Sequence, residues 1–354
     1  MREGAQNFRG EPRISFAKKM KYLTTFLLFM RNTLFYILVF AICLLCGLSR
    51  AKDEVVFVAA DSLSPATSAV YNGMRDAFED MKARFGKTME VRYVSANGSA
   101  DKQNLELGSA FTDGARAAVV LPVSGTSIKA KIKELAASGF PVAALGEESP
   151  ETGAFYCVRT DSKKTLEVLR EALSKFTRSG LYPLAVYFKS RESADKISLA
   201  DLSSHGKSLP PILPADSYKK LLGDYKILNV AAFPFYSGYW KANAIEIARY
   251  DNYGILFLGA DVLADVIPLS EDHDRRFAVC VGVLPQLDSY LASGQLDLCV
   301  YDDYYGWGYF AARALAEKVF EKTEPKERIY EIAPLQASPD KVAEFIKDWR
   351  KWLK

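Results

Sequence analysis

Histidine is nearly absent from this sequence, which contains only His205 and His273 among 354 residues. Three cysteines lie beyond residue 51, and they are far apart: Cys157, Cys280 and Cys299. Zinc sites need closely spaced cysteine and histidine ligands, so we expect no metal site in this part of the chain. We expect the three cysteines to be buried thiols, with a disulfide between Cys280 and Cys299 as the alternative in an oxidising compartment.

The sequence also lacks the commonest motifs of catalytic and nucleotide sites. It has no phosphate loop of the Walker type, no Gly-x-Gly-x-x-Gly turn after its first predicted strand and no Gly-x-Ser-x-Gly. These motifs carry the backbone donors and the nucleophiles of many nucleotide-binding enzymes and hydrolases. We therefore expect a protein that is not an enzyme and holds no cofactor.

Long apolar runs are missing except for one of 16 residues at positions 33–48. A membrane-spanning helix needs about 20 such residues. Basic residues precede the run, including Lys21 and Arg31, and a small-x-small site at 49–51 follows it. Residues 1–51 are therefore predicted to be a secretory signal peptide cleaved after Ala51, with an N-terminal extension upstream of Met30 and a periplasmic destination. A membrane anchor and lipid attachment at Cys46 are the alternatives.

An excess of positive charge is absent once this leader is set aside. The first 51 residues hold eight of the 46 Lys and Arg and two of the 43 Asp and Glu, so the rest carries a formal net charge of about −3. A nucleic-acid-binding surface would need clustered basic residues, and we expect none.

Apolar runs of strand length alternate with amphipathic segments of helical period from residue 54 onward. The predicted strands cover residues 55–60, 91–94, 117–121, 142–145 and 155–158, then 184–188, 227–232, 254–258, 277–283 and 296–301. Such alternation predicts an α/β fold in which parallel sheets are covered by helices on both faces. Two sets of five strands predict two doubly wound lobes.

The order of these elements resembles the sugar-binding class of periplasmic binding proteins, typified by ribose- and galactose-binding proteins. The resemblance covers residues 54–337 and includes VFVAADSLSPATSAVYNGMRDAFEDM at 56–81, PVAALGEE at 141–148 and GILFLGADVLADVI at 254–267. It implies the class I fold, in which two lobes are joined by a hinge of three crossings. On this basis the first lobe comprises residues 52–178 and 303–322, and the second comprises 179–302 and 323–354.

Several positions depart from the family pattern at the expected pocket. Ala66 and Thr67 replace the aromatic residues that commonly follow the first-strand proline, and Gly146 and Leu284 replace polar residues of the family. These departures argue against an ordinary monosaccharide pocket, although they leave the predicted fold intact.

Ligands of parallel α/β sheets bind beyond the carboxyl ends of the strands, which selects the candidate site. The candidates are Asp61, Ser62, Ser64, Ser124, Glu147, Asp161 and Asp302, together with the aromatic Tyr236, Trp240 and Tyr304. Asp161 can equally be a helix N-cap, and Glu147 part of a solvated turn. Asp302 is expected to anchor the ligand at the third crossing; capping the next helix or bracing the hinge are its alternatives.

The C-terminal segment 339–354 is predicted to form a helix docked on a lobe. It places Val342, Phe345, Ile346, Trp349 and Leu353 on one face. A partner-binding helix is the alternative.

The resemblance implies a monomeric protein that captures a small polar solute and delivers it to an ABC permease. A receptor that presents its bound ligand to a membrane chemoreceptor or sensor kinase is the alternative, and the sequence does not separate the two. A repressor of the same core fold would need a DNA-binding segment where this chain has its leader.

Overall fold

The computed structural model describes residues 53–62, 64–123, 125–146, 152–177, 183–189, 212–233, 252–264 and 276–354. The predicted leader, Ser124, Glu147, Tyr236 and Trp240 lie outside these residues. Residues 52–354 form one compact unit, separate from residues 1–51. Within the part that is described, no helix has the length and apolarity needed to cross a membrane.

The first sheet has six parallel strands in the order β11-β5-β4-β3-β1-β2. The strands are β1 (Glu54–Ala59), β2 (Glu90–Ser95), β3 (Ala117–Val120), β4 (Val142–Leu145), β5 (Tyr156–Thr160) and β11 (Ile329–Ile332). Along β1, Val55 and Phe57 face one helical layer and Val56 and Val58 face the other, and all four are buried. Apolar residues on both faces are what a doubly covered parallel sheet requires.

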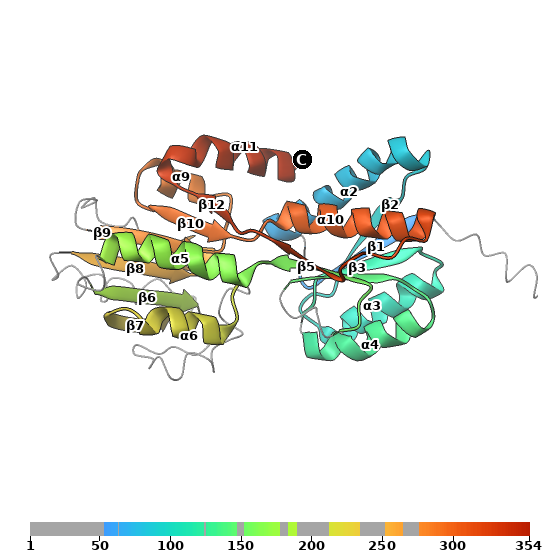
Figure 1. Ribbon diagram of the computed structural model, residues 1–354, viewed down its shortest axis with the longest axis horizontal. Coiled ribbons are helices and arrows are strands. Elements are labelled where there is room, and N and C mark those ends of the chain that lie inside the picture. Colours follow the sequence, from blue (N-terminus) through green and yellow to red (C-terminus); the bar gives the residue numbers. More distant parts are fainter. Residues whose placement is uncertain are drawn as a thin grey trace, which may run out of the picture. The chain divides into compact units, whose positions relative to one another are not determined.

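Four helices cover the first sheet (Figure 1). The helices α2 (Pro65–Phe85) and α10 (Tyr304–Ala316) lie on one face, and α3 (Ala100–Thr112) and α4 (Gly125–Ala137) lie on the other. The axes of α2 and α10 come very close at two glycines. A Cβ on Gly308 would lie 2.0 Å from the carbonyl oxygen of Val70, and one on Gly73 would lie 2.1 Å from that of Tyr305. Only glycine permits this approach.

The second sheet has the order β12-β10-β9-β8-β6-β7, and only β12 is antiparallel to its neighbour. Its strands are β6 (Leu184–Lys189), β7 (Ile227–Phe233), β8 (Tyr253–Leu258), β9 (Arg276–Val281), β10 (Leu298–Tyr301) and β12 (Leu335–Ala337). The helices α5 (Ser162–Thr177) and α6 (Ala215–Gly223) pack on one face, and α8 (Ala260–Ala264), α9 (Leu287–Ala292) and α11 (Val342–Trp352) pack on the other. The predicted α/β architecture of two doubly wound lobes is confirmed.

The chain passes between the sheets three times, and two of the expected boundaries differ from the observed ones. The first crossing is at Asp161, because Leu169 and Leu173 of α5 pack on the second sheet and not the first. The second is at residues 302–303. The third is at residues 333–334, because β11 pairs with β5 in the first sheet. The segment 162–178 therefore belongs with the second lobe, and 323–332 with the first.

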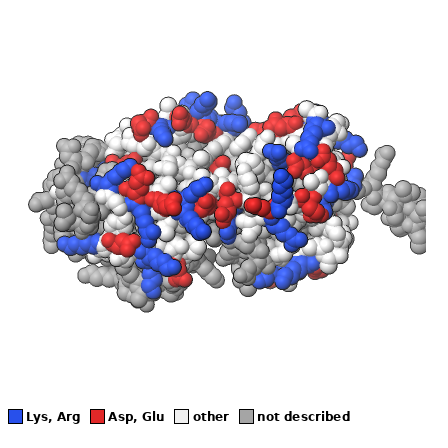
Figure 2. All heavy atoms as spheres, in the orientation of Figure 1, with Lys and Arg blue, Asp and Glu red and all other residues white. Residues whose placement is uncertain are grey.

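Charges of both signs are mixed on the face of the molecule that Figure 2 shows. On the face in Figure 2, Lys and Arg are interspersed with Asp and Glu over the described residues. Among the described residues, Arg84 forms ion pairs with Glu317 and Glu321.

Candidate functional site

The loop after β1 carries the two most accessible of the predicted ligand contacts that the structure describes. Asp61 and Ser62 are both exposed. The Tyr93 hydroxyl donates to the backbone carbonyl of Asp61 at 2.7 Å and so fixes the loop. Both side chains thus remain exposed on a braced loop at the carboxyl end of a central strand.

Ser64 has a structural task. It is the N-cap of α2, where its hydroxyl accepts from the Thr67 backbone N–H at 3.2 Å, and the Ser64 N–H donates to the Thr67 hydroxyl at 2.6 Å. This reciprocal capping box satisfies donors that the first helical turn leaves open. Pro65 follows at the first helical position, where its missing N–H costs nothing.

The loop after β3 is held by Gln103, a residue that sequence reasoning missed. The Gln103 side chain is fully buried; its Nε2 donates to the Leu121 carbonyl at 2.8 Å, and its Oε1 accepts from the Val123 N–H at 2.9 Å. The sequence offered one signal for this role, because Gln103 is a polar residue four positions before Leu107 and so lies on the same buried face of α3. Gln103 therefore positions the backbone that leads to Ser124.

The end of β4 faces an aromatic residue. Gly146 has φ of +93°, and a Cβ there would lie 3.9 Å from Cη2 of Trp307, which is itself buried against the first sheet. The ring of Tyr304 contacts that of Trp307 edge-on, with centroids 5.3 Å apart. The positive φ favours glycine at this position, and the Trp307 ring lies at an ordinary van der Waals distance from it.

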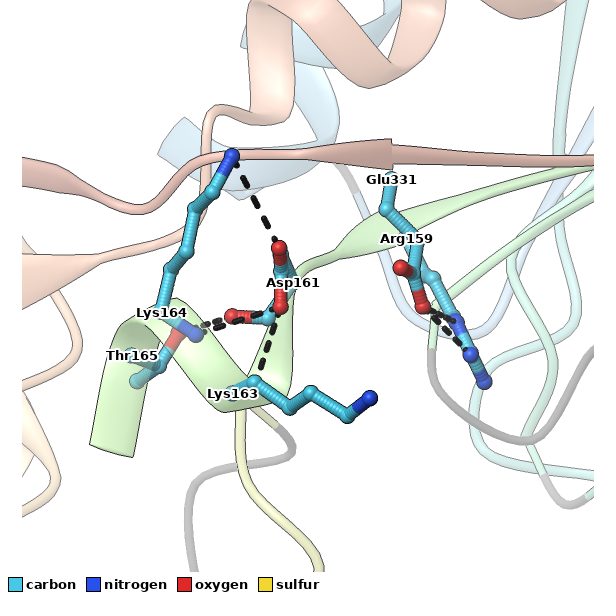
Figure 3. A network of polar contacts seen from close by, with 6 residues as sticks. All are labelled: Arg159, Asp161, Lys163, Lys164, Thr165 and Glu331. Atoms are coloured by element: carbon cyan, nitrogen blue, oxygen red, sulfur yellow. Dashed lines mark hydrogen bonds and ion pairs between the residues drawn. The ribbon is translucent and has the colours of Figure 1, made fainter. Parts of the chain in front are cut away.

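Asp161 is the N-cap of α5, so the capping alternative has direct contacts to support it. Figure 3 shows its carboxylate accepting from the Lys163 and Lys164 N–H groups, at 3.0 and 3.1 Å. The Asp161 N–H donates to the Ile332 carbonyl at 2.7 Å, which links the first crossing to the end of β11. Beside it, Arg159 of β5 forms an ion pair with Glu331 of β11. Its Nε and Nη2 both donate to Oε1 of Glu331, at 3.0 and 2.5 Å.

Asp302 lies at the second crossing, not the third, and is almost completely buried, with 2% of its surface exposed. The Thr160 hydroxyl donates to its Oδ1 at 2.5 Å, so the ends of β5 and β10 are joined by a side-chain hydrogen bond. Capping of α10 falls to the next residue, Asp303, which accepts from the Gly306 N–H at 2.7 Å. Of the two structural alternatives for Asp302, bracing the hinge is the one with contacts.

Tyr304 shares this buried environment. Burial raises the pKa of its hydroxyl well above the usual value, and the charge of Asp302 and a hydrogen bond to that carboxylate raise it further. The phenol therefore stays protonated at any physiological pH and serves as a donor beside the crossing.

The second lobe contributes mainly apolar groups to the described strand ends. Ala260 after β8 is buried, and Leu284 after β9 is partly buried and packs in the same apolar cluster. Cys280 and Cys299 are free buried thiols directly opposite each other on β9 and β10, and both donate to the Gly282 carbonyl. Nowhere in the described ranges do three or more potential ligands group in a way that could hold a metal ion.

Comparison with solved structures identifies the fold. A solute-binding protein from Bacillus halodurans with bound myo-inositol matches with a TM-score of 0.63 at 13% identity, over 84% of this chain and 99% of that one. A periplasmic ribose ABC transporter protein from Conexibacter woesei matches with a TM-score of 0.63 at 14% identity, over 86% and 98%. A myo-inositol-binding protein from Caulobacter matches with a TM-score of 0.61 at 17% identity, over 82% and 95%.

Sequence comparison adds nothing to this result, since no family model and no curated protein matches the chain. The structural matches extend over both lobes of this chain. Like this chain, they consist of two lobes that are each built on a parallel α/β sheet. The expected resemblance to sugar-binding solute-binding proteins is thus confirmed at the level of structure. The chain has the class I periplasmic-binding-protein fold.

Proposed function

We propose that this chain is an exported solute-binding protein that captures a small polar molecule, sugar-like or related, and delivers it to an ABC importer. The observation that carries the proposal is that strand ends from both sheets lie together where the chain passes from one lobe to the other. The Thr160 to Asp302 hydrogen bond and the Asp161 to Ile332 hydrogen bond bring together the ends of β5, β10 and β11. Ligands of open α/β sheets bind at such ends, and two lobes joined there can close on a ligand.

The solved structures of similar fold support the same activity. Their names describe solute-binding and transporter proteins for myo-inositol and ribose. A protein of this kind binds its ligand and releases it unchanged, so the proposal includes no catalytic step. Fold alone does not fix function, which is why the ligand needs a direct test.

The proposed contacts differ in how directly the structure supports them. Asp61 and Ser62 are exposed polar side chains on a braced loop, and they are the first-lobe contacts we favour. Ser64 and Asp161 cap helices, and Asp302 braces the hinge, so a second role in ligand contact stays a prediction for these three. Ser124, Glu147, Tyr236 and Trp240 also stay predictions. Tyr304 stays a proposed contact through its ring, because its hydroxyl proton is donated to Asp302.

A thermal-shift screen tests the proposal. The panel contains myo-inositol, ribose, arabinose, galactose, nucleosides and amino acids. A ligand at 100 times its Kd should stabilise the protein by about 2.7 kcal/mol. Stabilisation by one polyol or sugar without its consumption supports the proposal, whereas turnover of a bound compound contradicts it.

Transport and sensing are separated by a second measurement on the same ligand. Loss of the gene should abolish uptake of the radiolabelled compound if the protein feeds an importer. Unchanged uptake together with a lost chemotactic or transcriptional response would support the receptor alternative.

A further inference from the structure

The C-terminal helix α11 is anchored in the second lobe. Phe345 and Trp349 are both buried in the apolar cluster that covers one face of the second sheet. The Phe345 ring meets the ring of Tyr301, the last residue of β10, edge-on with centroids 6.0 Å apart. Trp349 in turn contacts Phe345 at 6.3 Å. Sequence periodicity assigned this packing face correctly for Phe345 and Trp349.

The last turn of α11 reaches the first lobe through Trp352. Its carbonyl accepts from Nδ2 of Asn72 on α2 at 2.7 Å, and its ring stacks on that of Tyr305 on α10, with centroids 6.0 Å apart and planes 10° apart. Lys351 adds a cation above the Tyr305 ring at 4.5 Å. The sequence had placed Leu353 on the packing face, but Leu353 is 43% exposed and Trp352 is buried.

The two ends of α11 thus contact residues that lie on opposite sides of the second crossing. Tyr301 ends β10 in the second sheet, Tyr305 lies in the first turn of α10 on the first sheet, and the second crossing separates them. Tyr305 is further fixed by donating to Asp76 of α2 at 2.7 Å. A rotation at the crossing that moves α10 relative to β10 must change either the Phe345 to Tyr301 contact or the Trp352 to Tyr305 contact.

We propose that α11 is a latch between the lobes, with Trp352 and Asn72 as its contact, and that this latch sets which lobe orientation the empty protein favours. The contact consists of one hydrogen bond, one aromatic stack and one cation–π pair, each weak enough to break reversibly. A ligand that closes the lobes must keep or exchange these contacts, so they bias the equilibrium between orientations. This inference goes beyond ligand capture, because it concerns the protein without ligand.

The test measures the distance between spin labels on the two lobes by pulsed electron paramagnetic resonance in the empty protein. Labels are placed at Lys133→Cys on α4 and Lys219→Cys on α6, both exposed, in a Cys43→Ser, Cys46→Ser background. The three remaining cysteines are buried and need no replacement. The latch variants are Trp352→Ala and Asn72→Asp, the second of which sets a carboxylate against the Trp352 carbonyl. Leu353→Ala is the matched control.

We expect both latch variants to shift or broaden the distance distribution, and Leu353→Ala to leave it as in the unmodified protein. Circular dichroism checks that the fold is retained. If Trp352→Ala fails to fold, Asn72→Asp decides alone, since Asn72 is only partly buried. An unchanged distribution in the folded latch variants would overturn the proposal, even if the ligand screen succeeds.

Discussion

The Thr160 hydroxyl donates a 2.5 Å hydrogen bond to the Asp302 carboxylate, and both residues are 2% exposed. The bond joins the end of β5 in the first sheet to the end of β10 in the second. A hydrogen bond to a buried charge is worth more than an ordinary one, so losing the Thr160 donor weakens the hydrogen bonding of a buried carboxylate. The hinge therefore contains a specific polar brace.

Removing either partner of this brace should destabilise the empty protein. We expect Thr160→Val and Asp302→Ala each to lower the free energy of unfolding by about 1.5–3 kcal/mol, measured by urea unfolding. The double variant should cost less than the sum of the two, because both changes remove one interaction. Strictly additive costs would show that the two residues act independently.

The same pair separates hinge bracing from ligand anchoring at Asp302. Thr160→Val removes the brace but keeps the carboxylate. If Asp302 also contacts the ligand, Asp302→Asn should weaken binding about tenfold more than Thr160→Val, a difference of about 1.4 kcal/mol by calorimetry. Equal affinities would leave Asp302 with the structural role alone.

Gly308→Ala should destabilise the first lobe. The added Cβ would meet the Val70 carbonyl at 2.0 Å, so α2 and α10 must move apart, and overpacking of this kind costs about 1–3 kcal/mol. Gly223 in α6 is the control, since a Cβ there has nothing within 4 Å. Thermal unfolding should show a lowered Tm for Gly308→Ala and an unchanged or raised Tm for Gly223→Ala. A similar Tm for the two variants would argue against the close helix contact.

Gln103→Leu should loosen the loop after β3. It leaves the Leu121 carbonyl and the Val123 N–H without their partner, at a cost of about 1–3 kcal/mol for each buried group left unpaired. Gln103→Glu keeps the acceptor for Val123 but sets a buried carboxylate against the Leu121 carbonyl, so it should also destabilise the protein at neutral pH. Hydrogen exchange of the Val123 amide should accelerate in Gln103→Leu. Unchanged exchange would mean that the loop is held by other contacts.

The pair Asp303 and Asp348 should make stability rise as the pH falls. Burial raises the pKa of Asp303, the Gly306 N–H opposes this, and the charge of Asp348 adds to it. Burial also raises the pKa of Asp348; Glu344 adds to that shift, whereas Lys347 and Lys351 oppose it. Because both pKa values are raised, the folded protein binds a proton at each carboxyl more tightly than the unfolded chain does. Protonation of the two carboxyls therefore stabilises the fold fully below their ordinary pKa of about 4. This stabilisation is lost as the pH rises through the raised pKa values.

Asp348→Asn tests this sign. We expect it to raise Tm at pH 7 and to lose that advantage as the pH approaches about 4, where the native carboxyl is protonated. Glu90→Gln, which changes an exposed acid on β2 of the first sheet, is the charge-matched control. A variant advantage that grows on acidification would contradict the assignment.

Local sequence patterns predicted the buried strands of the fold well. They predicted poorly which sheet a helix packs on and where a short edge strand lies. The β-branched and apolar runs of β1 and β3 were found because strands buried on both faces leave an unbroken apolar signal. The sheet on which α5 packs is set by contacts with β8 and β10, which the amphipathic pattern of α5 does not encode. The strand β11 has only the four residues Ile329–Ile332, too few for a periodic signal, and it was missed.

The candidate site rests on topology and stays a prediction, whereas the structural roles of its residues depend on their neighbours. Asp161 caps α5 through the N–H groups of Lys163 and Lys164, and its contact with a ligand stays a prediction. Asp302 and Asp303 are adjacent acids of identical chemistry, and only the three-dimensional structure assigns the brace to one and the cap to the other.

Isothermal titration calorimetry of the protein with the compound selected by the thermal-shift screen tests the central claim most directly. We predict one binding site per chain, a Kd of about 1 µM or lower, corresponding to about −8.2 kcal/mol or more favourable, and ligand recovered chemically unchanged after the titration. Binding should weaken when Asp61 is changed to alanine. Absence of saturable binding by any sugar or polyol, or conversion of the bound compound into a product, would contradict the account.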